Sequence, residues 1–126
     1  MHPEDLKYTN THEWVRVEDD LATVGITDHA QSELGDVVFV ELPEQGATLQ
    51  KDDVFGTIES IKTVTDLVAP VSGEVVEVND DLADTPERVN DSPYGTGWMI
   101  IIKLEDSSEI DDLLTSEQYE AFIKEL

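Results

Sequence analysis

The sequence predicts a mainly β protein, a flattened barrel or sandwich of short antiparallel strands with a few small helices. Short apolar runs with a period of two recur along the chain, and turn residues separate them at close spacing. The period changes to a helical one only in the last segment. At 126 residues, the chain is expected to form a single domain, spanning 1–126.

The strands are expected at residues 6–9, 11–17, 21–26, 36–42, 48–51, 55–59, 64–68, 74–78 and 98–104. The first suits an edge strand, and the second and third form a hairpin around the acidic turn Glu18-Asp19-Asp20. The run at 36–42 is almost continuously apolar, which predicts burial on both faces. The run at 98–104 is the most apolar, so we expect it to cross the middle of a sheet.

Two helices have recognisable start signals. Thr27 suits an N-cap and Gly35 can end the segment, which predicts a short helix near 28–34. Thr115 and Gln118 suit a capping box. The apolar residues that follow at helical spacing, namely Tyr119, Phe122, Ile123 and Leu126, predict a C-terminal helix near 116–125. We expect this helix to pack on the protein's own sheet, and binding of a partner is the alternative. Pro86 suits the first residue of a further short helical turn.

The stretch at 54–71 forms the centre of the prediction. Its two alternating arms predict a hairpin with Lys62 at the tip, although the tip lacks the usual Asn-Gly or Asp-Gly turn. In the first arm, we expect Val54 and Ile58 on one face and Phe55 and Thr57 on the other. Most lysines are solvated surface residues, but this chain has only five. A lysine on a rigid tip is suited to carry a covalently attached group, because acylation removes its charge and adds reach.

The composition is extremely acidic, with 7 basic and 30 acidic residues and a formal net charge of −23. Such a chain would not be attracted to nucleic acid or to an anionic membrane. A hydrophobic fraction of 39% argues against disorder. Docking to basic partners and adaptation to high salt stay open, and the even spread of the acids favours high salt, where screening weakens self-repulsion.

Cysteine is absent, so a redox dithiol would have to come from an added cofactor. The N-terminus has no signal-like pattern and no run approaches 18 apolar residues, so we expect a cytoplasmic protein without a membrane span. A metal site would have to combine His12, Glu13 and His29, whose spacing matches no ligand motif, so no metal is expected.

The residues around Lys62 resemble the lipoyl-lysine site of glycine cleavage H proteins. The resemblance includes Glu59-Ser60-Ile61-Lys62, Asp66-Leu67 and Ala69-Pro70-Val71-Ser72-Gly73-Glu74-Val75. Further blocks follow in the order of the family: Tyr8-Thr9, Thr11-His12-Glu13-Trp14-Val15, Gly25-Ile26-Thr27, Leu34-Gly35-Asp36, Val40-Glu41-Leu42-Pro43, Val78-Asn79 and Pro93-Tyr94-Gly95-x-Gly97-Trp98. Biotin carriers usually place methionine on both sides of their lysine, whereas Ile61 and Thr63 stand here.

The resemblance implies a lipoyl-carrier domain with lipoate in amide linkage on Lys62. Such a carrier is not an enzyme. It receives the aminomethyl group of decarboxylated glycine from a pyridoxal-phosphate glycine decarboxylase and presents it to a tetrahydrofolate-dependent aminomethyltransferase. A flavin (FAD) dihydrolipoyl dehydrogenase then reoxidises the arm. We expect a monomer that is also recognised by a lipoylating enzyme.

Further residue roles follow from the same resemblance. Glu59, Ser60 and Ile61 are expected to be recognised during lipoylation. Glu13 matches an acidic residue of the cleft into which the loaded arm folds. Two alternatives stay open: a lipoyl or acyl relay outside glycine cleavage, and an unmodified acidic module that binds basic partners.

Overall fold

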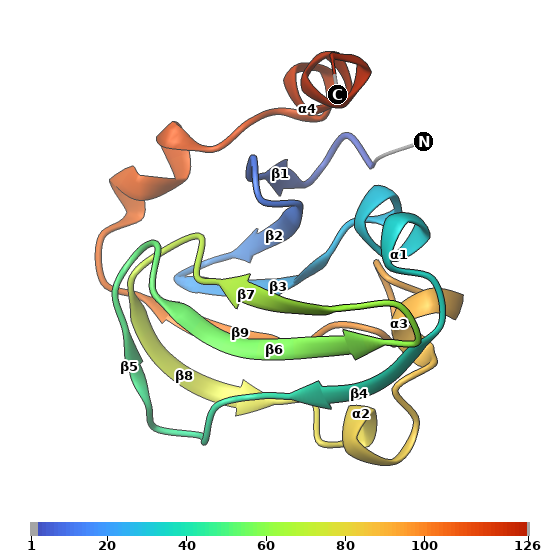
Figure 1. Cartoon of the computed structure of the whole chain (residues 1–126). Helices are drawn as coiled ribbons and strands as arrows, with labels where there is room; N and C mark the ends of the chain where they lie inside the picture. The colour runs from blue at the N-terminus through green and yellow to red at the C-terminus, as the bar shows by residue number, and fades with distance from the viewer. Residues whose placement is uncertain (1–2, 126) are drawn as a thin grey trace.

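A computed structural model describes residues 3–125; Met1, His2 and Leu126 lie outside the described residues. Within 3–125, the strands form two antiparallel sheets that pack face to face (Figure 1). The six-stranded sheet has the order β1 (Lys7–Tyr8), β2 (Glu13–Glu18), β3 (Leu21–Ile26), β9 (Ile100–Leu104), β8 (Gly73–Val78), β5 (Thr48–Leu49). The three-stranded sheet has the order β4 (Val37–Glu41), β6 (Val54–Ser60), β7 (Val64–Val68). This confirms the predicted sandwich, with every expected strand found within two residues of its predicted ends.

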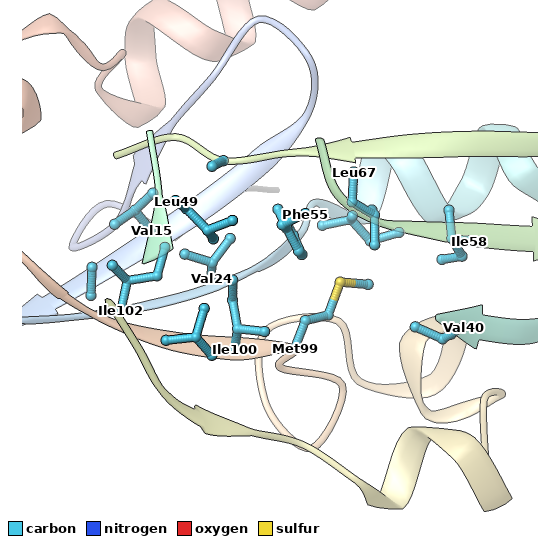
Figure 2. Close-up of a cluster of buried hydrophobic side chains, with 14 of the residues drawn as sticks. Val15, Val24, Val40, Leu49, Phe55, Ile58, Leu67, Met99, Ile100 and Ile102 are labelled. Atoms are coloured by element: carbon cyan, nitrogen blue, oxygen red, sulfur yellow. The ribbon is translucent and has the colours of Figure 1, made fainter. Parts of the chain in front are cut away.

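The main core lies between the two sheets (Figure 2). β9 pairs with β3 on one side and β8 on the other, as expected for the most apolar strand. Its Ile100 and Ile102 are fully buried and belong to the same core cluster as Phe55 and Leu67 of the smaller sheet (Figure 2). Aliphatic burial between the layers therefore holds the β6–β7 hairpin on the larger sheet.

The prediction that the 36–42 run is buried on both faces is wrong. Val37 and Val40 of β4 are buried, but Val38 and Phe39 are 48% and 49% exposed. β4 is an edge strand of the smaller sheet, and the outer face of that sheet is open to solvent. A continuous apolar run therefore does not by itself indicate a strand covered on both sides.

The predicted faces of the first hairpin arm are also wrong. A register shift between Val54 and Gly56 interrupts the pairing of β6 with β7. Phe55 and Ile58 are both buried in the core, whereas Val54 is 55% exposed. A bulge adds one residue to the strand and reverses the alternation beyond it, which the sequence period alone does not reveal.

Both predicted helices are confirmed. α1 (Asp28–Leu34) begins after Thr27, whose side chain accepts a hydrogen bond from the Ala30 amide, and ends at Gly35 with φ 79°. α4 (Ser116–Lys124) has the expected capping box of Thr115 and Gln118. The chain near Pro86 forms two short helices, α2 (Asp81–Asp84) and α3 (Arg88–Asp91), and the 3₁₀ helix η1 (Ser107–Asp112) was not predicted. Within 3–125, no helix is long and apolar enough to cross a membrane.

α4 packs on the protein's own sheet, as predicted. Its Tyr119 is fully buried and stacks on Tyr8 with ring centroids 4.9 Å apart, in a second cluster that includes Leu6 and Trp14. The Tyr119 hydroxyl also hydrogen-bonds the Thr27 hydroxyl at 2.8 Å. The C-terminal helix is thereby tied to the N-cap of α1, next to the functional site described below.

Candidate functional site

Lys62 lies in a turn that is shaped by Ser60. Glu59 pairs with Val64 across the β6–β7 hairpin, and the Ser60 amide donates to the Thr63 carbonyl at 2.8 Å. The Ser60 hydroxyl accepts from the amides of Lys62 and Thr63, each at 3.2 Å. Ser60 is only 5% exposed, while Lys62 projects into solvent. A side-chain oxygen therefore supplies the turn chemistry that the missing Asn-Gly pair would give.

The tip is also fixed to the neighbouring elements. The Ile61 amide donates to the Asp36 carbonyl at 3.0 Å. Asn90 of α3 holds the segment on either side of Asp36: its Oδ1 accepts from the Val37 amide at 2.8 Å, and its Nδ2 donates to the Gly35 carbonyl at 2.8 Å. Figure 1 shows the β6–β7 tip beside α1 and α3. The backbone that carries Lys62 is thus anchored at both the turn and the helix end.

The side chain of Lys62 lies against the end of α1. A Cβ atom on Gly35 would stand 3.3 Å from Lys62 Cε, so glycine leaves room for the lysine stem. A cavity of about 310 Å³ begins at the same helix, whose Glu33 and Leu34 line it. Its walls come from α1, from the β6–β7 hairpin, from the start of β2 with the segment before it, and from the end of β3. The lining residues are Thr11, His12, Glu13, Ile26, His29, Ala30, Glu33, Leu34, Ile58, Thr65, Asp66 and Leu67.

Glu13 is the buried carboxylate of this cavity. It is 1% exposed, and its Oε1 accepts from the hydroxyls of Thr9, at 2.6 Å, and Thr11. Its Oε2 accepts from the Val68 amide at 3.3 Å. Burial raises the pKa of Glu13, and the hydrogen bonds oppose that rise. Within 3–125, no cationic side chain forms an ion pair with it, so a cationic ligand group in the cavity would gain a preformed partner.

Two histidines line the cavity beside Glu13. The rings of His12 and His29 have centroids 4.9 Å apart, and His12 Nδ1 lies 2.7 Å from the Tyr119 hydroxyl. Burial and the neighbouring His29 lower the pKa of His12, which keeps its ring neutral at neutral pH. Among the described residues, no three His, Asp or Glu side chains are arranged to hold a metal ion.

The structure separates the sequence-predicted residues into two groups. Glu59, Ile61 and Lys62 are exposed around the tip, with Ser60 buried beneath them. Glu13 lies in the cavity wall that adjoins α1. Sequence reasoning missed Asn90, because nothing in its polar segment indicates a contact with residues more than fifty positions away. It also missed the cavity, whose walls come together only in the folded chain.

Comparison with known proteins gives a consistent result. The family model described as "Glycine cleavage H-protein" matches residues 6–126. Proteins named "Glycine cleavage system H protein" from Geobacillus kaustophilus and Bacillus subtilis are 62% and 58% identical over 123 residues, covering 98% of this chain and 97% of each relative.

The similarity extends to the fold. The crystal structure of a glycine cleavage system H protein from Mycobacterium marinum superimposes with a TM-score of 0.90 at 40% identity, covering 97% of this chain and 98% of that one. Both the sequence and the architecture therefore match over nearly the whole length. The chain belongs to the glycine cleavage H-protein family.

Proposed function

We propose that Lys62 carries lipoate in amide linkage and that Glu13 receives the charged end of the loaded arm. As a member of its family, the chain is the lipoyl-bearing shuttle of the glycine cleavage system. The observation that carries the assignment of Lys62 is its position: an exposed lysine on an anchored tip, in contact with the helix that lines the cavity. When bound, lipoate supplies the disulfide that accepts the aminomethyl group of decarboxylated glycine, chemistry that a chain without cysteine lacks.

The chain's own residues would orient and shelter the arm and leave bond making to the partner enzymes. Hydrophobic side chains such as Ile58 and Leu67 offer an apolar wall, and Glu13 offers a carboxylate to an ammonium group. Three hydrogen bonds offset part of the desolvation cost of Glu13 in the folded protein. Burial still raises its pKa, so a cation beside the carboxylate would add attraction in a region of low dielectric. This role is non-catalytic: the cavity would slow loss of the group until the next enzyme takes it.

The partners in this proposal are glycine decarboxylase, the tetrahydrofolate-dependent aminomethyltransferase, dihydrolipoyl dehydrogenase and the lipoylating enzyme. These enzymes use pyridoxal phosphate, tetrahydrofolate, FAD and NAD, and we propose that the chain acts with them in the cytoplasm. Glu59 and Ile61 are available for direct recognition by the lipoylating enzyme. Ser60 is buried and would act by shaping the turn that presents the lysine.

Intact-mass measurement tests the attachment site. The chain is produced with a lipoylating enzyme and lipoate, beside Lys62→Arg and the matched control Lys51→Arg. We expect one lipoyl increment on the wild type and on Lys51→Arg, and none on Lys62→Arg. A lipoylated Lys62→Arg protein would refute the assignment. Reconstitution with glycine decarboxylase then separates a glycine carrier from a lipoyl relay used elsewhere, because a relay would not accept the aminomethyl group.

The cavity proposal needs a separate measurement. With the arm loaded, the rate at which the aminomethyl group is lost to water is compared between wild type and Glu13→Ala. We expect faster loss in Glu13→Ala, because the carboxylate that holds the ammonium end is gone. An exposed acid on another face, Glu105→Ala, serves as control and should leave the rate unchanged. Equal rates in wild type and Glu13→Ala would reject the role of Glu13.

A further inference from the structure

The large apolar side chains exposed to solvent are unevenly distributed. Among the described residues, two lie at the β2–β3 hairpin and one at the start of β6. The other four surround the Lys62 tip: Val38 (48% exposed), Phe39 (49%), Ile61 (69%) and Val64 (61%). Exposure of a cluster of apolar side chains to water is unfavourable, and such a cluster is typical of an interaction site.

These side chains form a continuous surface on the outer face of the smaller sheet. Phe39 of β4 pairs with Glu59 of β6, and Glu59 pairs with Val64 of β7, so the three stand in one row across the sheet. The register shift between Val37 and Phe39 places Val38 beside this row. Ile61 extends it to the tip, directly next to Lys62.

A second row carries negative charge. Glu41 pairs with Thr57, and Thr57 pairs with Asp66. The surface therefore has an apolar strip with one carboxylate, Glu59, in its middle and two more carboxylates along one side. We define this set, Val38, Phe39, Glu41, Glu59, Ile61, Val64 and Asp66, as the tip face.

The charge pattern identifies the occupant. A second copy of the chain is opposed by the net charge of −23 on each molecule and by the carboxylates that two tip faces would bring together. An enzyme surface with an apolar centre and an arginine or lysine opposite Glu59 would satisfy both features. An enzyme that acts on an arm attached to Lys62 must also approach this end of the sandwich.

We propose that the tip face is the docking surface for glycine decarboxylase, which places a cationic side chain opposite Glu59. This inference rests on the proposed function, since it takes Lys62 as the attachment site. It assigns Val38, Phe39 and Val64 a role in protein recognition that is separate from holding the fold. It also gives Glu59 a use after lipoylation is complete.

The test uses full-length lipoylated protein, verified by mass, as substrate for purified glycine decarboxylase. We compare wild type with Phe39→Ser and Val64→Ser, and use Leu21→Ser as control, because Leu21 is also exposed (38%) but lies on the β2–β3 hairpin at the opposite end of the sandwich (Figure 1). We expect KM for the carrier to rise roughly tenfold in both tip-face variants, with kcat retained. Leu21→Ser should match wild type. Phe39→Ser and Val64→Ser with wild-type KM would overturn the proposal.

Charge provides the second readout. Glu59→Gln should raise KM and weaken its dependence on salt, whereas Glu105→Gln, at the far end of β9, should do neither. If the two variants change KM equally, the effect comes from the net charge of the protein, and a specific contact of Glu59 is rejected. Different results refute the proposed function and the docking surface. The proposed function is refuted if wild-type protein, shown by mass to be lipoylated, supports no turnover. Only the docking surface is refuted if wild type turns over normally and the tip-face variants behave like it.

Discussion

Replacing Asn90 by alanine should loosen the lysine tip, and the structure sets the size of the effect. The carboxamide makes three hydrogen bonds, to the Val37 amide, the Gly35 carbonyl and Gln31. Val37 is 4% exposed, so its amide would be left unsatisfied at a cost of about 1–3 kcal/mol. The other two bonds are half-buried and contribute about 1 kcal/mol each. We expect a loss of about 3–5 kcal/mol in the free energy of unfolding.

Urea denaturation and amide exchange test this prediction together. With a urea dependence of about 2 kcal/mol per molar, the midpoint should fall by about 1.5–2.5 M. The matched control is Asn79→Ala, which removes two hydrogen bonds, to the carbonyls of Thr96 and Trp98, away from the tip. Both variants should be destabilised, but only Asn90→Ala should speed exchange of the Ile61 amide relative to that of Ile102. An unchanged midpoint, or equal Ile61 exchange in the two variants, would refute the reasoning.

Three further predictions concern stability. Burial raises the pKa of Glu13, so the folded chain binds more protons than the unfolded chain between the ordinary and the raised value, and stability falls as pH rises through that window. Glu13→Gln should therefore gain stability relative to wild type as the pH rises from the ordinary glutamate pKa through the raised one, which urea titrations at a series of pH values measure. Gly25→Ala should cost about 1–3 kcal/mol, since its Cβ would stand 2.7 Å from the buried Trp14 ring, and thermal unfolding measures this loss. The melting temperature should rise steeply between low and molar KCl if self-repulsion among 30 acids is screened, and a flat response would contradict adaptation to salt.

The elements that sequence reasoning found are those specified by local signals. Thr27 and Gly35 delimit α1 because capping and a positive φ are properties of single residues. The errors at β4 and in β6 have a different origin. Whether Phe39 is covered depends on which strand lies at the edge of the sheet, and whether Val54 faces the core depends on a bulge. Both features are set by the tertiary structure and leave the local sequence pattern unchanged.

The site shows the same division between local and long-range information. Lys62 and its neighbours form one continuous stretch, which a family resemblance can identify. The cavity joins Glu13 to residues of α1 and β7, and Asn90 reaches Gly35 from α3. No short window of sequence contains either relation. The sequence therefore identified the proposed attachment point, and the fold was needed to show what holds this lysine in place and what lies beside it.

A carrier lysine must meet two opposing demands, and the tip satisfies them with different atoms. Under the proposed assignment, the side chain of Lys62 has to be free, because several enzymes must reach the arm that it would bear. The backbone has to be fixed, because an arm on a mobile loop would lose the entropy of both loop and arm each time it entered the cavity. Ser60 and Asn90 use buried hydrogen bonds to fix the backbone, and Gly35 leaves the stem uncovered. Conformational freedom is thereby confined to the part of the molecule that has to move.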